Sequence, residues 1–144
     1  SYLATGSDSQ IQTVFNALDV KRIIQHSMND EYPQIKHGAW RLIGNLLSGP
    51  NEIAETLLKN GLAPLFYTNL TSKQKATRLE TLWSLSNILA NGSDVIEEVL
   101  NEKNLMLVLI NIFENDDYRV KKEVMHCFCN MSTFATYQQI QKMA

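Results

Sequence analysis

The sequence predicts an all-α solenoid assembled from repeated units of three helices, and three observations carry that prediction. Similar helical segments recur at a step of 42 or 43 residues, a second block recurs in phase with them, and no segment alternates apolar and polar residues as a strand does. The connections between the expected helices are only a few residues long, which favours helices packed on their neighbours over a mixed fold.

The repeat is clearest in three segments that align on one asparagine. They are AWRLIGNLLSG (39–49), LWSLSNILANG (82–92) and MHCFCNMSTFA (125–135), aligned on Asn45, Asn87 and Asn130. The opening SYLATG aligns with them when Tyr2 takes the asparagine position, so that the steps are 43, 42 and 43 residues. Three steps of about the same length indicate a repeat array rather than a chance similarity.

A second block sets the number of helices in each unit. DVKRII (19–24), GLAPLF (61–66) and NLMLVL (104–109) place apolar residues at equivalent points. The middle unit is therefore predicted to contain helices over roughly 51–60, 62–71 and 74–90. A period near 42 residues with three helices is the length of an armadillo repeat, whereas a HEAT unit has two helices. We expect a right-handed superhelix of armadillo repeats.

The period also divides the chain. We expect one armadillo-repeat segment over 1–144, which contains the end of one repeat (1–6), three repeats (7–49, 50–92 and 93–135) and the start of the next (136–144). Gly6, Gly49 and Gly92 recur at a step of 43 residues, and we expect them to end helices in the left-handed conformation. Both ends of the sequence fall inside predicted helices, so we expect a piece of a longer array.

Charge and composition narrow the class of partner. The 13 Lys and Arg against 15 Asp and Glu give a net charge of -2, which supplies no electrostatic reason to expect nucleic acid or an anionic membrane. No stretch approaches the roughly 20 apolar residues of a membrane span, and the first residues lack the pattern of a signal peptide. The chain is expected to be intracellular, with any charged recognition confined to a local surface.

The third helix of the middle unit separates core residues from available ones. Since successive residues of a helix are about 100° apart, the apolar residues of this helix lie on one face, which we expect to be the core face. Glu80, Trp83 and Asn87 lie on a second face. The predicted core residues in the three units are Trp40, Ile43 and Leu47; Leu82, Leu85 and Leu89; and Met125, Phe128 and Met131. The residues equivalent to the second face are Gly38, Arg41 and Asn45, and Glu123, His126 and Asn130.

This second face predicts the binding of an extended peptide. Stacking the repeats arranges these positions as a ladder with one rung per repeat. The asparagine at each rung offers a hydrogen-bond donor and an acceptor, so the ladder can pair with a peptide backbone whatever its sequence. The Trp83 indole can stack on the stem of a lysine or arginine, worth roughly 0.5 to 2 kcal/mol per contact, while Glu80 and Glu123 supply the opposing charge. The alternatives are that Trp83 belongs to the core and that each asparagine satisfies a local backbone group.

At this point the chain resembles the importin α (karyopherin α) family, whose third helices carry the motif W-x-x-x-N. WSLSN (83–87) matches in full, SYLATG has tyrosine at the asparagine position as one family repeat does, and RLIGN (41–45) has arginine at the tryptophan position as the next repeat does. The resemblance places the chain in the back half of the array. It implies a nuclear import adaptor of the cytoplasm and nucleus that binds Lys/Arg-rich nuclear localisation signals together with importin β.

The resemblance also implies which residues form the site. The fragment would hold the minor signal-binding groove, with Trp83, Asn87, Asn45 and Asn130 as its ladder and Glu80 and Glu123 as acidic partners. Tyr2 and Arg41 belong to the stretch between the two grooves, and the importin β-binding segment is not in this sequence. His126 stands where the family has tryptophan and Thr5 where it often has aspartate, which indicates a divergent member. His126 either meets the peptide or turns away within its own repeat.

The sequence leaves two other functions open, a different armadillo scaffold and an enzyme. A catenin-like armadillo scaffold would share the fold, but its groove should be basic and take acidic peptides, whereas the rungs here carry glutamates. An enzyme would need Cys127 or Cys129 activated by His126, yet neighbouring residues on one helix point to different faces. His26 and His37 show no metal-ligand spacing, so neither a metal nor another cofactor is expected.

Overall fold

A computed structural model of the chain describes residues 7–136 and residue 141, and all regular structure in these residues is helical. The helices are α1 (Asp8–Asn16), α2 (Val20–Ser27), α3 (Pro33–Leu46), α4 (Asn51–Lys59), α5 (Leu62–Leu70), α6 (Lys75–Leu89), α7 (Ser93–Leu100), α8 (Leu105–Asn115) and α9 (Tyr118–Phe134). The expected helices of the middle unit, α4 to α6, are found within about one residue of their predicted ends.

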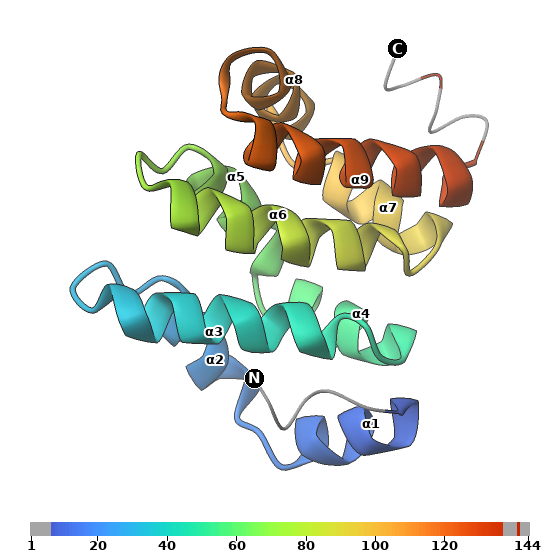
Figure 1. Ribbon diagram of the computed structural model, residues 1–144. Helices are drawn as coiled ribbons and strands as arrows, with labels where there is room; N and C mark the ends of the chain where they lie inside the picture. Colours follow the sequence, from blue (N-terminus) through green and yellow to red (C-terminus); the bar gives the residue numbers. More distant parts are fainter. Residues whose placement is uncertain (1–6, 137–140, 142–144) are drawn as a thin grey trace.

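The third helix of each unit builds a layer of its own. Figure 1 shows α3, α6 and α9 lying side by side toward the viewer, with the shorter helices behind them. α6 packs against α3 on one side and against α9 on the other. A surface on the face that this layer forms therefore draws its residues from these three helices.

Local sequence signals start several of these helices. Asp19 accepts a hydrogen bond from the Arg22 amide at 3.3 Å, and Asp117 accepts from the amides of Arg119 and Val120 at 3.0 and 3.2 Å. Each aspartate thus satisfies backbone donors that have no partner within the helix. Pro33 occupies the first turn of α3, where its missing amide proton costs nothing.

The core runs through all three units, and most of the predicted core residues lie in it. Trp40, Ile43, Leu47, Leu82, Leu85, Leu89 and Met131 are at most 1% exposed. The prediction was wrong for Met125, which is 42% exposed, and only half right for the half-buried Phe128. The reason is packing: α6 has a third helix on each side, whereas α9 packs chiefly against α6 and, less extensively, against α8 and α7.

Gly49 and Gly92 do not end helices in the left-handed conformation that the sequence predicted. Gly49 is absent from the positive-φ residues of the described chain, and a Cβ there would lie 2.6 Å from Cγ2 of Ile11. Close packing against α1 therefore explains this glycine. Gly92 has a φ of 112° but caps the beginning of α7 rather than the end of α6, and Gly6 lies outside the described residues.

Candidate functional site

The predicted site residues lie on the α3, α6 and α9 layer. Those in the described part of the chain are Arg41, Asn45, Glu80, Trp83, Asn87, Glu123, His126 and Asn130, and each is exposed or half-buried. We call this set the rung face. Tyr2 lies outside the described residues. On α6, Leu82 and Leu85 are buried while Trp83 and Asn87 remain partly accessible, so the helix separates its core side from this face.

Trp83 lies against the neighbouring repeat. A Cβ placed on Gly44 of α3 would fall 2.4 Å from Cζ3 and 2.6 Å from Cε3 of the Trp83 ring. The indole thus rests on a stretch of α3 backbone that carries no side chain. It remains half-buried rather than buried, which separates it from Trp40, whose exposed fraction is 0%.

The asparagines of the rung face bond to the preceding repeat. Nδ2 of Asn87 donates to the Gly44 carbonyl at 2.8 Å, and Nδ2 of Asn130 donates to the Ser86 carbonyl at 2.8 Å. Each acceptor directly precedes the asparagine of its own helix. The sequence-based prediction assigned both amide functions to a peptide, but one donor of each of these side chains already joins two repeats.

Glu80 is paired within the protein. Nη2 of Arg41 donates to Oε1 of Glu80 at 2.9 Å, and the Glu80 side chain is 22% exposed. The sequence suggested that Glu80 would pair with a cation of the bound peptide. In the structure it pairs instead with Arg41, which occupies the tryptophan position of the preceding repeat. The guanidinium of Arg41 in one repeat thus pairs with the carboxylate of Glu80 in the next repeat.

His126 and Glu123 form a second, looser pair. Nδ1 of His126 lies 3.4 Å from Oε2 of Glu123, one turn away on the same helix. The His126 side chain is 51% exposed and that of Glu123 is 26% exposed, so both groups are accessible from the rung face. His126 thus makes a contact within its own repeat, which was one of the two alternatives for this residue. The contact leaves the imidazole ring accessible to solvent.

A second set of contacts fixes the register of the third helices and was missed from the sequence. Oγ of Ser84 donates to the Trp40 carbonyl at 3.1 Å, and Sγ of Cys127 donates to the Leu82 carbonyl at 3.5 Å. Ser84 and Cys127 are equivalent positions in α6 and α9. The signal available in the sequence was a small side chain with a donor group three residues before Asn87 and Asn130, where the equivalent residue before Asn45 is Leu42.

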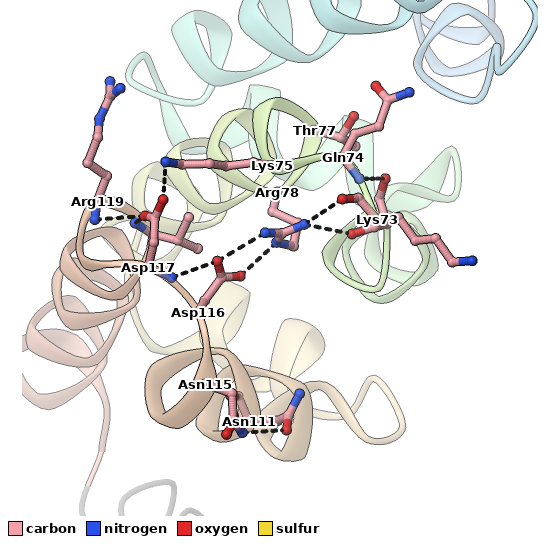
Figure 2. A network of polar contacts seen from close by, with 12 residues as sticks. Lys73, Gln74, Lys75, Thr77, Arg78, Asn111, Asn115, Asp116, Asp117 and Arg119 are labelled. Atoms are coloured by element: carbon pink, nitrogen blue, oxygen red, sulfur yellow. Dashed lines mark hydrogen bonds and ion pairs between the residues drawn. The ribbon is translucent and has the colours of Figure 1, made fainter.

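An ionic network joins the repeats at the other end of α6, away from the rung face. Figure 2 shows Arg78 of α6 bonded to Asp116 through two hydrogen bonds, Nε to Oδ2 at 2.7 Å and Nη2 to Oδ1 at 3.0 Å. Lys75 pairs with Asp117 beside it. Burial alone would raise the pKa of Asp116, but the bonds from Arg78 and from the Asp117 amide outweigh it, and the net pKa lies below that of an ordinary aspartate.

A cavity of about 670 Å³ borders this network between α5 and α8 and not the rung face. Its lining includes Tyr67, Leu107, Asn111 and the paired Arg78 and Asp116. A peptide site on a solenoid is an extended surface rather than a closed pocket, so its absence from the cavities is expected.

The chemistry of the cysteines does not suit catalysis. Cys127 is buried, and burial, with the Glu123 carboxylate adding to it, raises the pKa of its thiol far above the usual range. Its buried thiol therefore cannot serve as a nucleophile, and the neighbouring Cys129 is exposed on another side of the helix. Among the described residues no group of three or more His, Cys, Asp or Glu side chains is placed to hold a metal ion. Nor is any helix there long and apolar enough to cross a membrane.

The fold defines the class of protein, an armadillo-repeat solenoid. The chain superposes on a designed armadillo repeat protein in complex with the peptide (KR)4 with a TM-score of 0.90 and 22% identity, over 99% of this chain and 59% of that one. It also superposes on computationally designed armadillo repeat proteins for modular peptide recognition, with a TM-score of 0.86 and 19% identity over 99% of this chain and 58% of that one. These likenesses confirm the predicted fold.

Sequence comparison then leads to one family within that class. Importin subunit alpha-2 of Arabidopsis thaliana is 29% identical over 105 residues, which are 73% of this chain and 20% of that protein. Importin subunit alpha-1a of Oryza sativa subsp. japonica is 28% identical over 102 residues, 70% of this chain and 19% of that protein. Importin subunit alpha-8 of Arabidopsis thaliana is 26% identical over 136 residues, 94% of this chain and 30% of that protein.

The chain is therefore similar to importin α subunits, at the distance of a divergent relative, as its repeat motifs predicted. It spans less than a third of the length of these relatives. No protein-family model matches the chain. The similar proteins are adaptors or scaffolds and not enzymes, in agreement with the function class expected from the sequence.

Proposed function

We propose that the rung face binds an extended Lys/Arg-rich peptide of the nuclear localisation signal type. The observation that carries the proposal is the Trp83 ring, which stays half-buried on the layer of third helices while its neighbours Leu82 and Leu85 are buried. A half-exposed indole beside carboxylates is suited to the stem and charge of a lysine or arginine. The motif similarity to importin α and the basic peptide bound by a designed neighbour support this choice of ligand.

The asparagines would hold the peptide backbone. In Asn87 one amide proton is used between the repeats, and in Asn130 Nδ2 donates to both the carbonyl and the Oγ of Ser86, while neither amide oxygen accepts a hydrogen bond from the described residues. A peptide N–H can donate to these oxygens, and the second amide proton of Asn87 can donate to a peptide carbonyl. The bond to the preceding repeat holds each amide in place before the peptide arrives, which lowers the entropy lost on binding.

The charge on the rung face favours a cation next to α9. Glu80 is matched by the Arg41 guanidinium at 2.9 Å. Glu123 faces only an imidazole at 3.4 Å among the ion pairs of the described chain, so more of its charge remains to attract a peptide cation. A peptide lysine or arginine would therefore lie between the Trp83 and His126 rungs.

A cellular role follows from the family similarity as part of the same proposal. An adaptor of this kind would carry proteins with basic signals from the cytoplasm into the nucleus, together with importin β bound through a segment outside this sequence. The relatives that share its motifs are named importin α subunits, and that name supports the role.

Calorimetric titration tests the proposal. A Lys/Arg-rich peptide should bind the chain, and a peptide with those residues changed to glutamate should not. Trp83→Ala should weaken binding roughly tenfold, because the stacked cation contact is worth on the order of 1 to 2 kcal/mol. Leu107→Ala is the control, since it removes a 66% exposed apolar side chain from α8, away from the rung face. Tighter binding of the acidic peptide, or equal binding by both variants, would refute the proposal.

A further inference from the structure

Gly44 of α3 touches the two central residues of the rung face. The Trp83 ring lies where its Cβ would be, with Cζ3 at 2.4 Å and Cε3 at 2.6 Å from that point, and its carbonyl accepts the Asn87 hydrogen bond at 2.8 Å. Real Cβ atoms do not approach a ring carbon this closely, and the contact involves the rigid six-membered ring rather than the end of a flexible chain. A side chain at residue 44 therefore cannot coexist with the present position of the indole.

The next interface of the same molecule shows the other solution. The residue equivalent to Gly44 is Ser86 of α6, and the residue equivalent to Trp83 is His126 of α9. Ser86 accepts from Nδ2 of Asn130 with its carbonyl at 2.8 Å and with its Oγ at 3.1 Å. The indole of Trp83 thus faces Gly44, which has no side chain. The smaller imidazole of His126 belongs to the interface in which the equivalent residue is a serine. At these equivalent positions the glycine accompanies the larger ring and the serine accompanies the smaller one.

We propose that Gly44 is a positioning residue of the peptide site, which seats the Trp83 indole against α3 and so sets where its free face meets the stem of a peptide lysine or arginine. This inference rests on the proposed function. A methyl group at residue 44 would push the ring away from α3 toward solvent. The asparagine bond would survive that change, because its acceptor is the main-chain carbonyl of residue 44.

The chain contains a matched control for this change. Gly38 lies on the same helix, and a Cβ there would meet no atom of the described residues within 4 Å. Replacing an exposed helical glycine with alanine normally favours the folded state, since alanine loses less backbone entropy on folding. Gly38→Ala should therefore raise the melting temperature, whereas Gly44→Ala should lower it because the indole is displaced.

The position of the indole is measured without any peptide. The sequence has two tryptophans, of which Trp40 is fully buried, so acrylamide quenching of the fluorescence reports on Trp83. Gly44→Ala should increase quenching and shift the indole N–H resonance of Trp83 in a 15N-labelled sample, and Gly38→Ala should change neither. An unmoved Trp83 resonance with unchanged quenching in a folded Gly44→Ala chain would overturn the proposal.

Peptide affinity is the second measurement. Gly44→Ala should weaken binding of the Lys/Arg-rich peptide roughly three- to tenfold, as expected for the loss of a stacked cation contact, and Leu107→Ala on α8, away from the rung face, should leave it unchanged. Equal affinities in the two variants would show that Gly44 does not position the site. A wild-type chain that binds no basic peptide would refute the proposed function, and the quenching and resonance data would still decide whether Gly44 seats the indole.

A double variant covers the case in which Gly44→Ala does not fold. Gly44→Ser combined with Trp83→His copies the Ser86–His126 pair, so the two changes together should melt higher than Gly44→Ser alone. This rescue is expected because the imidazole is smaller than the indole that clashes. Additive effects of the two substitutions on the melting temperature would contradict the steric coupling between residues 44 and 83.

Discussion

The Arg41 guanidinium donates to the Glu80 carboxylate at 2.9 Å, from α3 across to α6. This pair makes the two glutamates of the rung face unequal, although their positions in the repeat are equivalent. Glu80 faces a permanent cation, and Glu123 faces the His126 ring at 3.4 Å. The attraction for an incoming basic side chain is therefore stronger at the α9 end of the face.

The first prediction concerns this inequality. Glu123→Gln should weaken binding of a Lys/Arg-rich peptide roughly fivefold, as expected for losing about 1 kcal/mol of charge attraction, and Glu80→Gln should have a smaller effect. In an Arg41→Gln background Glu80 is released, so Glu80→Gln should then matter as much as Glu123→Gln. Calorimetry at low salt measures all of these affinities. Equal effects of the two glutamate variants in the Arg41 chain would contradict the pairing argument.

A second prediction concerns the asparagines as structural residues. Asn87→Ala and Asn130→Ala should each lower the free energy of unfolding by about 1 kcal/mol, because each removes a hydrogen bond between two repeats and leaves a carbonyl without its donor. Denaturant titration followed by circular dichroism measures this loss in the absence of peptide. The exposed Asn101 provides the control, and Asn101→Ala should change stability much less. Wild-type stability in both variants would mean that these bonds do not hold the repeats together.

The third prediction follows from the Arg78–Asp116 contact. Since the pKa of Asp116 is lowered in the folded state, its ionised form stabilises the fold above the ordinary value of 3.8, and this contribution disappears as the pH falls below it. Asp116→Asn should therefore lower the free energy of unfolding at pH 7 by on the order of 2 kcal/mol, and the difference from wild type should shrink at pH 3. Urea titrations at both pH values test it, with Asp94→Asn, an exposed residue, as control. A difference that stays constant with pH would rule out this role.

A fourth prediction distinguishes the two cysteines. Cys129 is exposed and Cys127 is buried with a raised thiol pKa, so a thiol reagent at pH 8 should modify one cysteine in the folded chain and both in denaturant. Cys129→Ser should abolish the reaction of the folded chain. Rapid modification of the folded Cys129→Ser protein would show that Cys127 is accessible and would reopen the question of its reactivity.

Much of the fold could be predicted because the same pattern of helices occurs in several repeats of the sequence. A helix seen at one position was supported by equivalent residues 42 or 43 positions away, and the middle unit was predicted within about one residue at each helix end. The same reasoning failed for Met125, which was predicted to be a core residue. Its equivalent, Leu82, is buried because α6 has a third helix on each side, whereas Met125 lies on the side of α9 that the described helices leave open.

The partners of the site residues could not be predicted in the same way. Arg41 and Glu80 are 39 residues apart, and their contact depends on how α3 and α6 are rotated about their axes. The same holds for Asn87 and the Gly44 carbonyl, which are 43 residues apart. Helical periodicity identifies the face on which a side chain lies, but the distance across an interface of two helices is set by the packing of both.

The acceptors of the asparagine bonds are main-chain carbonyls, which every amino acid possesses. A substitution at residue 44 or 86 changes what the side chain does but leaves the acceptor in place. The alignment of neighbouring repeats is thus less sensitive to sequence change at residues 44 and 86. A chain only 26–29% identical to these relatives can in this way keep the arrangement of its repeats.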